Sequence, residues 1–234
     1  MKLEIKNIKK KFKKNEVLRG VEYTFENGKI YGLLGRNGAG KTTFFNILYK
    51  ELKPDEGEIE FSENSDKSFK LDDVGMLFAE TSLPEFLTAY EYIKFIIDIK
   101  NPHDIENIDK YFDYMSINER DRHKLIKEFS SGMKSKVALL AIYIQKPKVI
   151  LLDEPLTAVD VVSGAEIKKF FRSLKNDHII IVSTHMLDLA KDLCDEIVLL
   201  HNGKFESLED LEKDENYESR IVEALKESGE DNHD

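Results

Sequence analysis

The chain of 234 residues is 41% hydrophobic and 34% charged, which is ordinary for a globular protein and argues against wholesale disorder. Its net charge is -10, and nearly all of it comes from residues 206–234, which hold 12 acidic and 3 basic residues. We therefore expect a solvated, partly helical acidic tail and no nucleic-acid surface. The lone Cys194 excludes an internal disulfide, and the longest apolar run, residues 137–144, is far short of the ~20 residues of a membrane helix.

Alternating apolar and polar residues begin the chain, over residues 3–6 and again over 21–26, and predict strands of a half-exposed sheet. Between them, residues 9–14 are lysines interrupted by Phe12. No row of aromatic residues accompanies these lysines, so a solvated turn is favoured over a nucleic-acid surface. Phe12 lies upstream of a glycine-rich loop, where an aromatic ring could stack on a nucleotide base.

Residues 35–42 match the phosphate-loop pattern G-x-x-x-x-G-K-[ST] at every fixed position. An apolar run over 30–34 predicts a buried strand before the loop, and helical spacing over 43–48 predicts a helix after it. Such a loop can wrap an anion with inward N–H groups, with Lys41 on the β- and γ-phosphates and the Thr42 hydroxyl on Mg²⁺. The alternative is a glycine-rich turn that binds nothing. The predicted nucleotide-binding residues are Phe12, Gly35, Arg36, Asn37, Gly38, Ala39, Gly40, Lys41, Thr42 and Thr43.

The middle of the chain changes character. After short predicted strands at residues 58–61 and 73–78, the pattern from Thr88 to Lys136 is helical and is broken once, at Asn101-Pro102. This stretch reads as a helical lobe inserted into an α/β core. Four aromatic residues near its beginning could belong to the core of the lobe or line a groove for another protein; they are Phe86, Tyr90, Tyr92 and Phe95.

Short apolar runs then predict parallel strands covered on both faces, at residues 149–152, 179–182 and 197–200. Helical stretches separate these runs, so a doubly wound sheet is expected. Asn202-Gly203 predicts a hairpin directly before the acidic tail.

Two carboxylates, Asp153 and Glu154, follow the first of these runs. Successive strand residues point in opposite directions, so the two side chains are expected to have different roles. Asp153 suits the Mg²⁺ shell, and Glu154 suits a general base for water attacking the γ-phosphate. The alternative is an exposed acidic turn after a core strand.

These segments together resemble the ATP-binding-cassette (ABC) family, over about residues 3–205. Residues 130–134 (Ser-Ser-Gly-Met-Lys) resemble the family signature, residues 156–160 the D-loop, and residues 183–185 the segment with the switch histidine, His185. Phe12 falls where the family has a base-stacking aromatic. Apart from the resemblance, the two serines of residues 130–131 would be read as a helix N-cap and His185 as an ordinary core or surface histidine.

The resemblance implies an α/β fold: a P-loop NTPase (RecA-like) core with an antiparallel β subdomain and an inserted all-helical subdomain. One ABC ATPase domain would span residues 1–234. Residues 1–78 and 137–205 would form the core with the β subdomain, residues 79–136 the helical subdomain and signature region, and residues 206–234 the acidic tail.

The family likeness also implies an activity and partners. The chain would be an ATP- and Mg²⁺-dependent ATPase in a head-to-tail dimer, either homodimer or heterodimer, with Glu154 and His185 as catalytic residues. The signature residues Ser130, Ser131, Gly132 and Met133 would meet the partner subunit's ATP, beside the D-loop residue Asp160. A transmembrane permease on a separate chain would hold the subunit on the cytoplasmic face of the membrane and export a peptide, drug or lipid. The alternatives are an importer subunit, a soluble cassette ATPase and a regulatory module that hydrolyses ATP poorly.

Several positions depart from the family pattern. Ser131 replaces a common glycine and Met133 a common glutamine; similar Gly-Met-Lys forms occur in exporter subunits with separate membrane polypeptides. The Q-loop glutamine is replaced by Ala79 or Glu80, of which Glu80 could still contact Mg²⁺ or water. Leu156 takes the place of a small polar residue.

Overall fold

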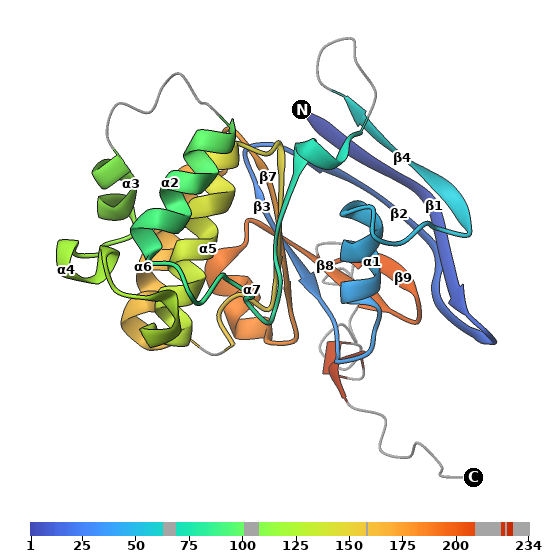
Figure 1. Ribbon diagram of the computed structural model, residues 1–234. Coiled ribbons are helices and arrows are strands. Elements are labelled where there is room, and N and C mark those ends of the chain that lie inside the picture. Colours follow the sequence, from blue (N-terminus) through green and yellow to red (C-terminus); the bar gives the residue numbers. More distant parts are fainter. Residues whose placement is uncertain (63–68, 101–107, 158, 209–220, 223, 227–234) are drawn as a thin grey trace.

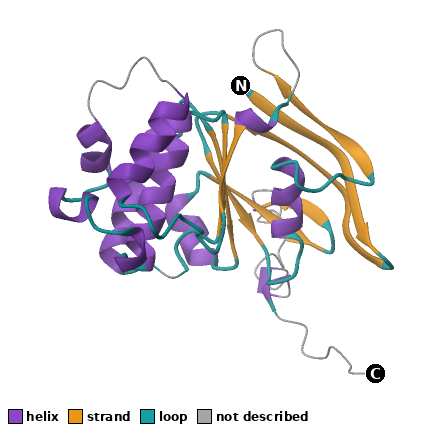
Figure 2. Ribbon diagram, in the orientation of Figure 1, coloured by secondary structure: helices purple, strands orange, loops and turns teal. Residues whose placement is uncertain are grey.

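The chain folds around two β-sheets, shown with their helices in Figures 1 and 2. A computed structural model describes residues 1–62, 69–100, 108–157, 159–208, 221–222 and 224–226. The smaller sheet is antiparallel with strand order β2-β1-β4. Its strands are β1 (Lys2–Phe12), β2 (Asn15–Glu26) and β4 (Glu56–Ser62). Alternation therefore predicted the sheet correctly, although the strands extend beyond the alternating segments.

The larger sheet has strand order β5-β6-β7-β3-β8-β9. Its strands are β3 (Ile30–Leu34), β5 (Val74–Leu77), β6 (Val149–Asp153), β7 (Ile179–Thr184), β8 (Glu196–His201) and β9 (Lys204–Ser207). All pairs are parallel except β8 with β9, which a turn at Asn202-Gly203 connects. Both turn residues have positive φ, 50° and 75°, which explains this dipeptide at a hairpin. The predicted doubly wound sheet and hairpin are confirmed.

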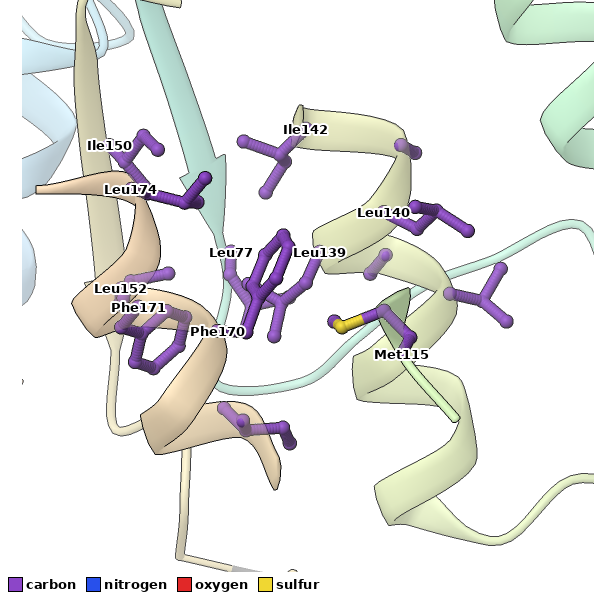
Figure 3. Close-up of a cluster of buried hydrophobic side chains, with 14 of the residues drawn as sticks. Leu77, Met115, Leu139, Leu140, Ile142, Ile150, Leu152, Phe170, Phe171 and Leu174 are labelled. Atoms are coloured by element: carbon purple, nitrogen blue, oxygen red, sulfur yellow. The ribbon is translucent and has the colours of Figure 1, made fainter. Parts of the chain in front are cut away.

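Each face of the larger sheet has its own hydrophobic core. On β6, Val149 and Leu151 pack toward helix α1 (Lys41–Leu48) and the antiparallel sheet. Ile150 and Leu152 point the other way, toward α5 (Ser131–Gln145) and α6 (Val161–Leu174), as Figure 3 shows. Because successive strand residues alternate between faces, a continuous apolar run is what a strand covered on both sides requires.

The remaining helices are α2 (Ala89–Lys100), α3 (Ile108–Tyr114), α4 (Glu119–Arg122) and α7 (Leu187–Leu193). Helices α2 to α4 form the helical lobe to one side of the sheet, together with the start of α5 (Figure 1). Thr88 and Glu91 form a capping box at the start of α2. The predicted break at Asn101-Pro102 lies outside the described residues. Helix α5 continues without interruption past position 136, where the sequence placed the end of the lobe.

Arg122 connects several segments of the helical lobe. Its Nε donates to the carbonyl of Ile117 (3.0 Å), its two terminal nitrogens donate to Asp109 and Asp113, and its guanidinium lies over the ring of Phe112. The side chain is nearly buried, so its removal leaves acceptors without their donors. We expect Arg122→Ala to lower the free energy of unfolding by about 2 kcal/mol in urea denaturation.

Arg120→Ala, on the exposed side of the same short helix, is the matched control. It should change the free energy of unfolding by less than about 0.5 kcal/mol. Equal values for the two variants would contradict the assigned role of Arg122.

The prediction of a solvated acidic tail is wrong for several residues. Strand β9 includes Glu206 and Ser207. Leu208, Ile221 and Ala224 are buried in a cluster with apolar residues of β3, β8 and α7. Ile221 and Ala224 are three residues apart, a helical spacing that places both side chains on one face. The other tail residues lie outside the described part of the chain.

Cys194 follows α7 and is partly buried. A Cβ on Gly32 of the neighbouring strand would come within 2.9 Å of its Sγ. Burial raises the pKa of the thiol to about 12, so the sulfur stays protonated at neutral pH. This agrees with a small core residue rather than a nucleophile.

Candidate active site

The glycine-rich loop of residues 35–40 connects the carboxyl end of β3 to α1. Gly38 and Gly40 have φ values of 77° and 108°, and a Cβ on Gly40 would come 2.8 Å from a methyl carbon of Val17. Glycine is therefore required at position 40 both for conformation and for space. No side chain of the described residues caps the start of α1, and the first N–H groups of a helix can bind an anion.

Lys41 is the first residue of α1 and is only 6% exposed. Its Nζ donates to the carbonyl oxygens of Gly35 (2.6 Å) and Arg36 (3.2 Å) and lies 3.5 Å from Oε1 of Glu154. Burial lowers the pKa of Lys41, and the charge of Glu154 opposes that shift. The loop therefore fixes a cation beside its own N–H groups, an arrangement suited to a multiply charged phosphate.

Asp153 ends β6 and is 4% exposed. Its Oδ2 accepts a hydrogen bond from Thr42 Oγ1 (3.0 Å), and its Oδ1 accepts one from Ser183 Oγ. A carboxylate and a hydroxyl oxygen thus meet at the start of α1. Hard oxygen ligands of this kind suit Mg²⁺, which protein sites bind through one or two such groups together with substrate phosphates. The donor set fits the metal that a phosphate-loop protein requires.

Glu154 has left the strand, because β6 ends at Asp153 and Glu154 has φ 48°. The two carboxylates therefore diverge through a left-handed turn, and not through strand alternation as the sequence suggested. Such a conformation costs a residue other than glycine of the order of 1 kcal/mol and is frequent at functional sites. Oε1 of Glu154 faces Nδ1 of His185 at 3.0 Å, and Oε2 accepts from Thr157 Oγ1 at 3.2 Å. The turn thus brings Lys41, Glu154 and His185 together.

Two adjoining cavities open at this edge of the sheet. One, of about 280 Å³, is lined by Phe12, Val17, Asn37, Gly38, Gly40, Lys41, Thr42, Thr43, Ala79, Asp153 and Glu154. Phe12, 45% exposed at the end of β1, lies on it together with the phosphate loop. Three residues of the loop do not line this cavity: Gly35, Arg36 and Ala39. The carbonyl oxygens of Gly35 and Arg36 accept hydrogen bonds from Lys41, and the N–H of Ala39 donates to the carbonyl of Arg36.

The second cavity, of about 500 Å³, lies between the carboxyl end of β5 and the start of α5. Ala79, Glu80, Ser131, Glu154 and His185 are among its lining residues. Glu80 is exposed and lines only this cavity of the two, whereas Ala79 lines both. Glu80 thus shares the second cavity with Glu154 and His185.

The signature residues lie at the start of α5. Ser130 caps the helix, its Oγ accepting from the Met133 N–H (3.3 Å), and Ser130 and Ser131 are exposed. Gly132 is buried where an added Cβ would come 3.3 Å from a carboxylate oxygen of Asp160. None of these residues lines the phosphate-loop cavity. Ser131 lines the second cavity instead, with Glu154 and His185.

Asp160 caps α6, accepting hydrogen bonds at 3.0 Å from the N–H groups of Val162 and Ser163. The hydrogen bond from Ser163 is the main cause that lowers the pKa of Asp160. The amino ends of α5 and α6 therefore lie against each other through Gly132 and Asp160. Leu156 packs with the hydrophobic core, and Ala158 lies outside the described residues.

Sequence reasoning missed two residues, Ser183 and Thr157. Thr157 binds the Glu154 carboxylate, and Ser183 binds both Asp153 and Glu154. A signal for Ser183 was present, because two hydroxyl residues end an otherwise apolar buried strand, Ile179–Thr184. A buried polar side chain needs a hydrogen-bond partner, and the nearest strand end carries the carboxylates.

The phosphate loop, its buried lysine and the carboxylates of the neighbouring strand define a phosphate-loop nucleoside triphosphatase. A protein-family model described as ABC transporter matches residues 18–157, more than half of the chain. The chain therefore belongs to the ABC transporter family and is one of its ATP-binding ATPase domains.

Relatives over nearly the full length support this assignment. The ABC transporter ATP-binding protein NatA of Bacillus subtilis is 32% identical, over 90% of this chain and 92% of that protein. The tungstate uptake ATP-binding protein TupC of Peptoclostridium acidaminophilum is 34% identical, over 87% and 96%. The lantibiotic transport ATP-binding protein SrtF of Streptococcus pyogenes is 29% identical, over 92% and 94%.

A solved structure of an ATP-binding subunit of an ABC transporter superimposes with a TM-score of 0.79. It covers 96% of this chain and 99% of the other, at 23% identity. The fold prediction is thereby confirmed. No helix in the described part of the chain has both the length and the apolar character of a membrane span.

Proposed function

We propose that this chain is the ATPase subunit of an exporter whose membrane-spanning part is a separate polypeptide. The observation that carries the ATPase part of the proposal is the convergence of Lys41, Glu154 and His185 beside the Thr42–Asp153 pair. The likeness to SrtF, which by its name serves lantibiotic transport, and the Gly-Met-Lys form of the signature favour export.

In this proposal ATP lies along the loop, with its base against Phe12 and its phosphates against the N–H groups at the start of α1. Lys41 turns from Glu154 to the β- and γ-phosphates. Thr42 and Asp153 would hold Mg²⁺, which when bound neutralises charge on those phosphates. Glu80, on the second cavity, is a candidate for contacting water near the γ-phosphate.

Glu154 acts as the general base. It accepts a proton from the attacking water as the new bond to the γ-phosphorus forms and the bond to the bridging oxygen of ADP breaks. His185 donates a hydrogen bond to the γ-phosphate and holds the geometry during transfer. Thr157 and the turn at residue 154 keep the carboxylate directed toward that position.

A dimer completes the site. The exposed start of α5, with Ser130 and Ser131, offers hydroxyls and a helix N-terminus that the phosphate loop of the same chain does not use. Beside it, Val161 and Val162 are 90% and 70% exposed, an apolar surface suited to an interface. In the proposed head-to-tail dimer, the signature of each subunit covers the ATP of the other.

We place the subunit on the cytoplasmic face of the membrane, held there by its partner. Phe86 and Phe95 of the helical lobe are 79% and 56% exposed and are candidates for that contact. Tyr90 and Tyr92 pack against the core instead. We keep the division into core, helical subdomain and tail as a proposal; α5 crosses the boundary at residues 136/137 and β9 the boundary at residues 205/206.

An importer subunit is the second candidate, because TupC, by its name part of a tungstate uptake system, is similar over most of its length. Both candidates require the same ATPase. A phosphate-release assay on the purified chain tests it first: we expect turnover with Mg²⁺ and none after chelation with EDTA. ATP binding without turnover in this assay would favour the regulatory module.

A further inference from the structure

The hydroxyl of Ser183 lies between the two carboxylate residues. Ser183 belongs to β7, the strand between β6 and β3 in the sheet, and it is fully buried. In the parallel pairing of β6 with β7 it stands opposite Asp153. Paired residues of adjacent strands project from the same face, so the hydroxyl lies beside the carboxylate.

Ser183 makes two hydrogen bonds of opposite sense. Its Oγ donates to Oδ1 of Asp153 and accepts from the backbone N–H of Glu154 (3.1 Å). A hydroxyl has one proton to donate and lone pairs to accept with, so both bonds can exist together. The bond to Oδ1 leaves Oδ2 facing Thr42 Oγ1 at 3.0 Å. One side chain thus orients the Asp153 carboxylate and holds the residue after it.

The second bond explains how the turn at Glu154 is maintained. Strand pairing ends at Asp153, so the N–H of Glu154 has left the ladder of β6 and β7. Ser183 supplies its acceptor, and Glu154 keeps φ 48°. In this conformation the carboxylate lies 3.5 Å from Lys41 Nζ and 3.0 Å from His185 Nδ1. A shift of the turn would move the base relative to the phosphate loop.

We infer that Ser183 is a positioning residue for ATP hydrolysis, which orients Asp153 toward Mg²⁺ and Glu154 toward the attacking water. The inference rests on the proposed function, in which Asp153 and Glu154 have those roles. Hydrogen-bonding partners of metal ligands contribute about 10–100-fold to metal affinity or activity. A merely structural hydroxyl would contribute to stability and leave the Mg²⁺ requirement unchanged.

Ser183→Ala tests this. We expect kcat to fall about 10–100-fold, and the Mg²⁺ concentration for half-maximal binding of a fluorescent ATP analogue to rise about tenfold or more. The KM for ATP at saturating Mg²⁺ should stay within about threefold, because the loop and Lys41 are unchanged. Ser183→Thr keeps the hydroxyl and should recover most of the loss.

Ser173→Ala is the matched control. Its hydroxyl donates to the carbonyl of Phe170 (2.7 Å) within α6, away from the site, so the variant loses a hydroxyl hydrogen bond without touching the carboxylates. Thermal unfolding is measured for every variant. If Ser183→Ala does not fold, Ser183→Cys, whose thiol is a weak donor, serves in its place with the same expected direction.

The inference would be overturned if folded Ser183→Ala or Ser183→Cys had the kcat and the Mg²⁺ requirement of the parent chain. The proposed function would then remain intact. A parent chain without Mg²⁺-dependent ATP turnover would overturn the proposed function and the inference with it.

Discussion

Lys41→Ala should bind ATP about 10–100-fold more weakly than the parent chain. Lys41 is buried, and its ammonium is fixed by the carbonyls of Gly35 and Arg36 where the phosphates are expected. A hydrogen bond to a charged group contributes about 1.5–3 kcal/mol, and 1.4 kcal/mol corresponds to a factor of ten in affinity. Equilibrium binding of a fluorescent ATP analogue in the presence of Mg²⁺ measures the effect.

Lys94→Ala is a suitable control, because Lys94 is an exposed helix residue paired only with Asp98 among the ion pairs of the described residues. This substitution removes the same charge from the surface, and the ATP affinity should stay within about twofold of that of the parent chain. Unchanged affinity in Lys41→Ala would contradict the assignment of residues 35–42 as the phosphate site.

Glu154→Gln should reduce turnover by about 10²–10⁴-fold, the usual contribution of a positioned general base. The amide keeps the shape of the side chain but cannot accept the proton of the attacking water. ATP binding should persist or tighten, since Lys41 loses its partner at 3.5 Å within the chain. Steady-state phosphate release and nucleotide binding, measured on the same preparation, separate the two effects.

Glu56→Gln provides the control for that substitution. Glu56 is an exposed carboxylate that pairs with Lys9 on the antiparallel sheet, away from the phosphate loop. Its turnover should equal that of the parent chain. A Glu154→Gln variant with turnover within threefold of the parent would remove Glu154 from the role of base.

Much of the fold was predictable because its signals are local. The predicted strand at residues 30–34 agrees with β3, and the runs at 149–152 and 179–182 lie within β6 and β7. Apolar runs of this length indicate strands that are covered on both faces. The dipeptide Asn202-Gly203 likewise predicts the hairpin turn that follows β8. The phosphate loop is equally local, since its glycines, lysine and threonine are consecutive.

The remaining features depend on contacts between distant segments. The left-handed turn at Glu154 depends on a hydrogen bond to Ser183, 29 residues later, and on the end of strand pairing. Burial of Ile221 and Ala224 depends on an apolar surface made by β3, β8 and α7. No local pattern encodes such partners. Strand alternation was therefore the wrong explanation for the divergence of the carboxylates, and the prediction of a solvated tail was wrong for these residues.

A crystal structure of Glu154→Gln with ATP and Mg²⁺ tests the central claim most directly. We predict the γ-phosphate within hydrogen-bonding distance of Lys41 Nζ, the metal between Thr42 and Asp153, and the side chain of residue 154 facing the terminal phosphorus. A nucleotide bound away from residues 35–42, or a side chain at position 154 turned away from the γ-phosphate, would contradict it.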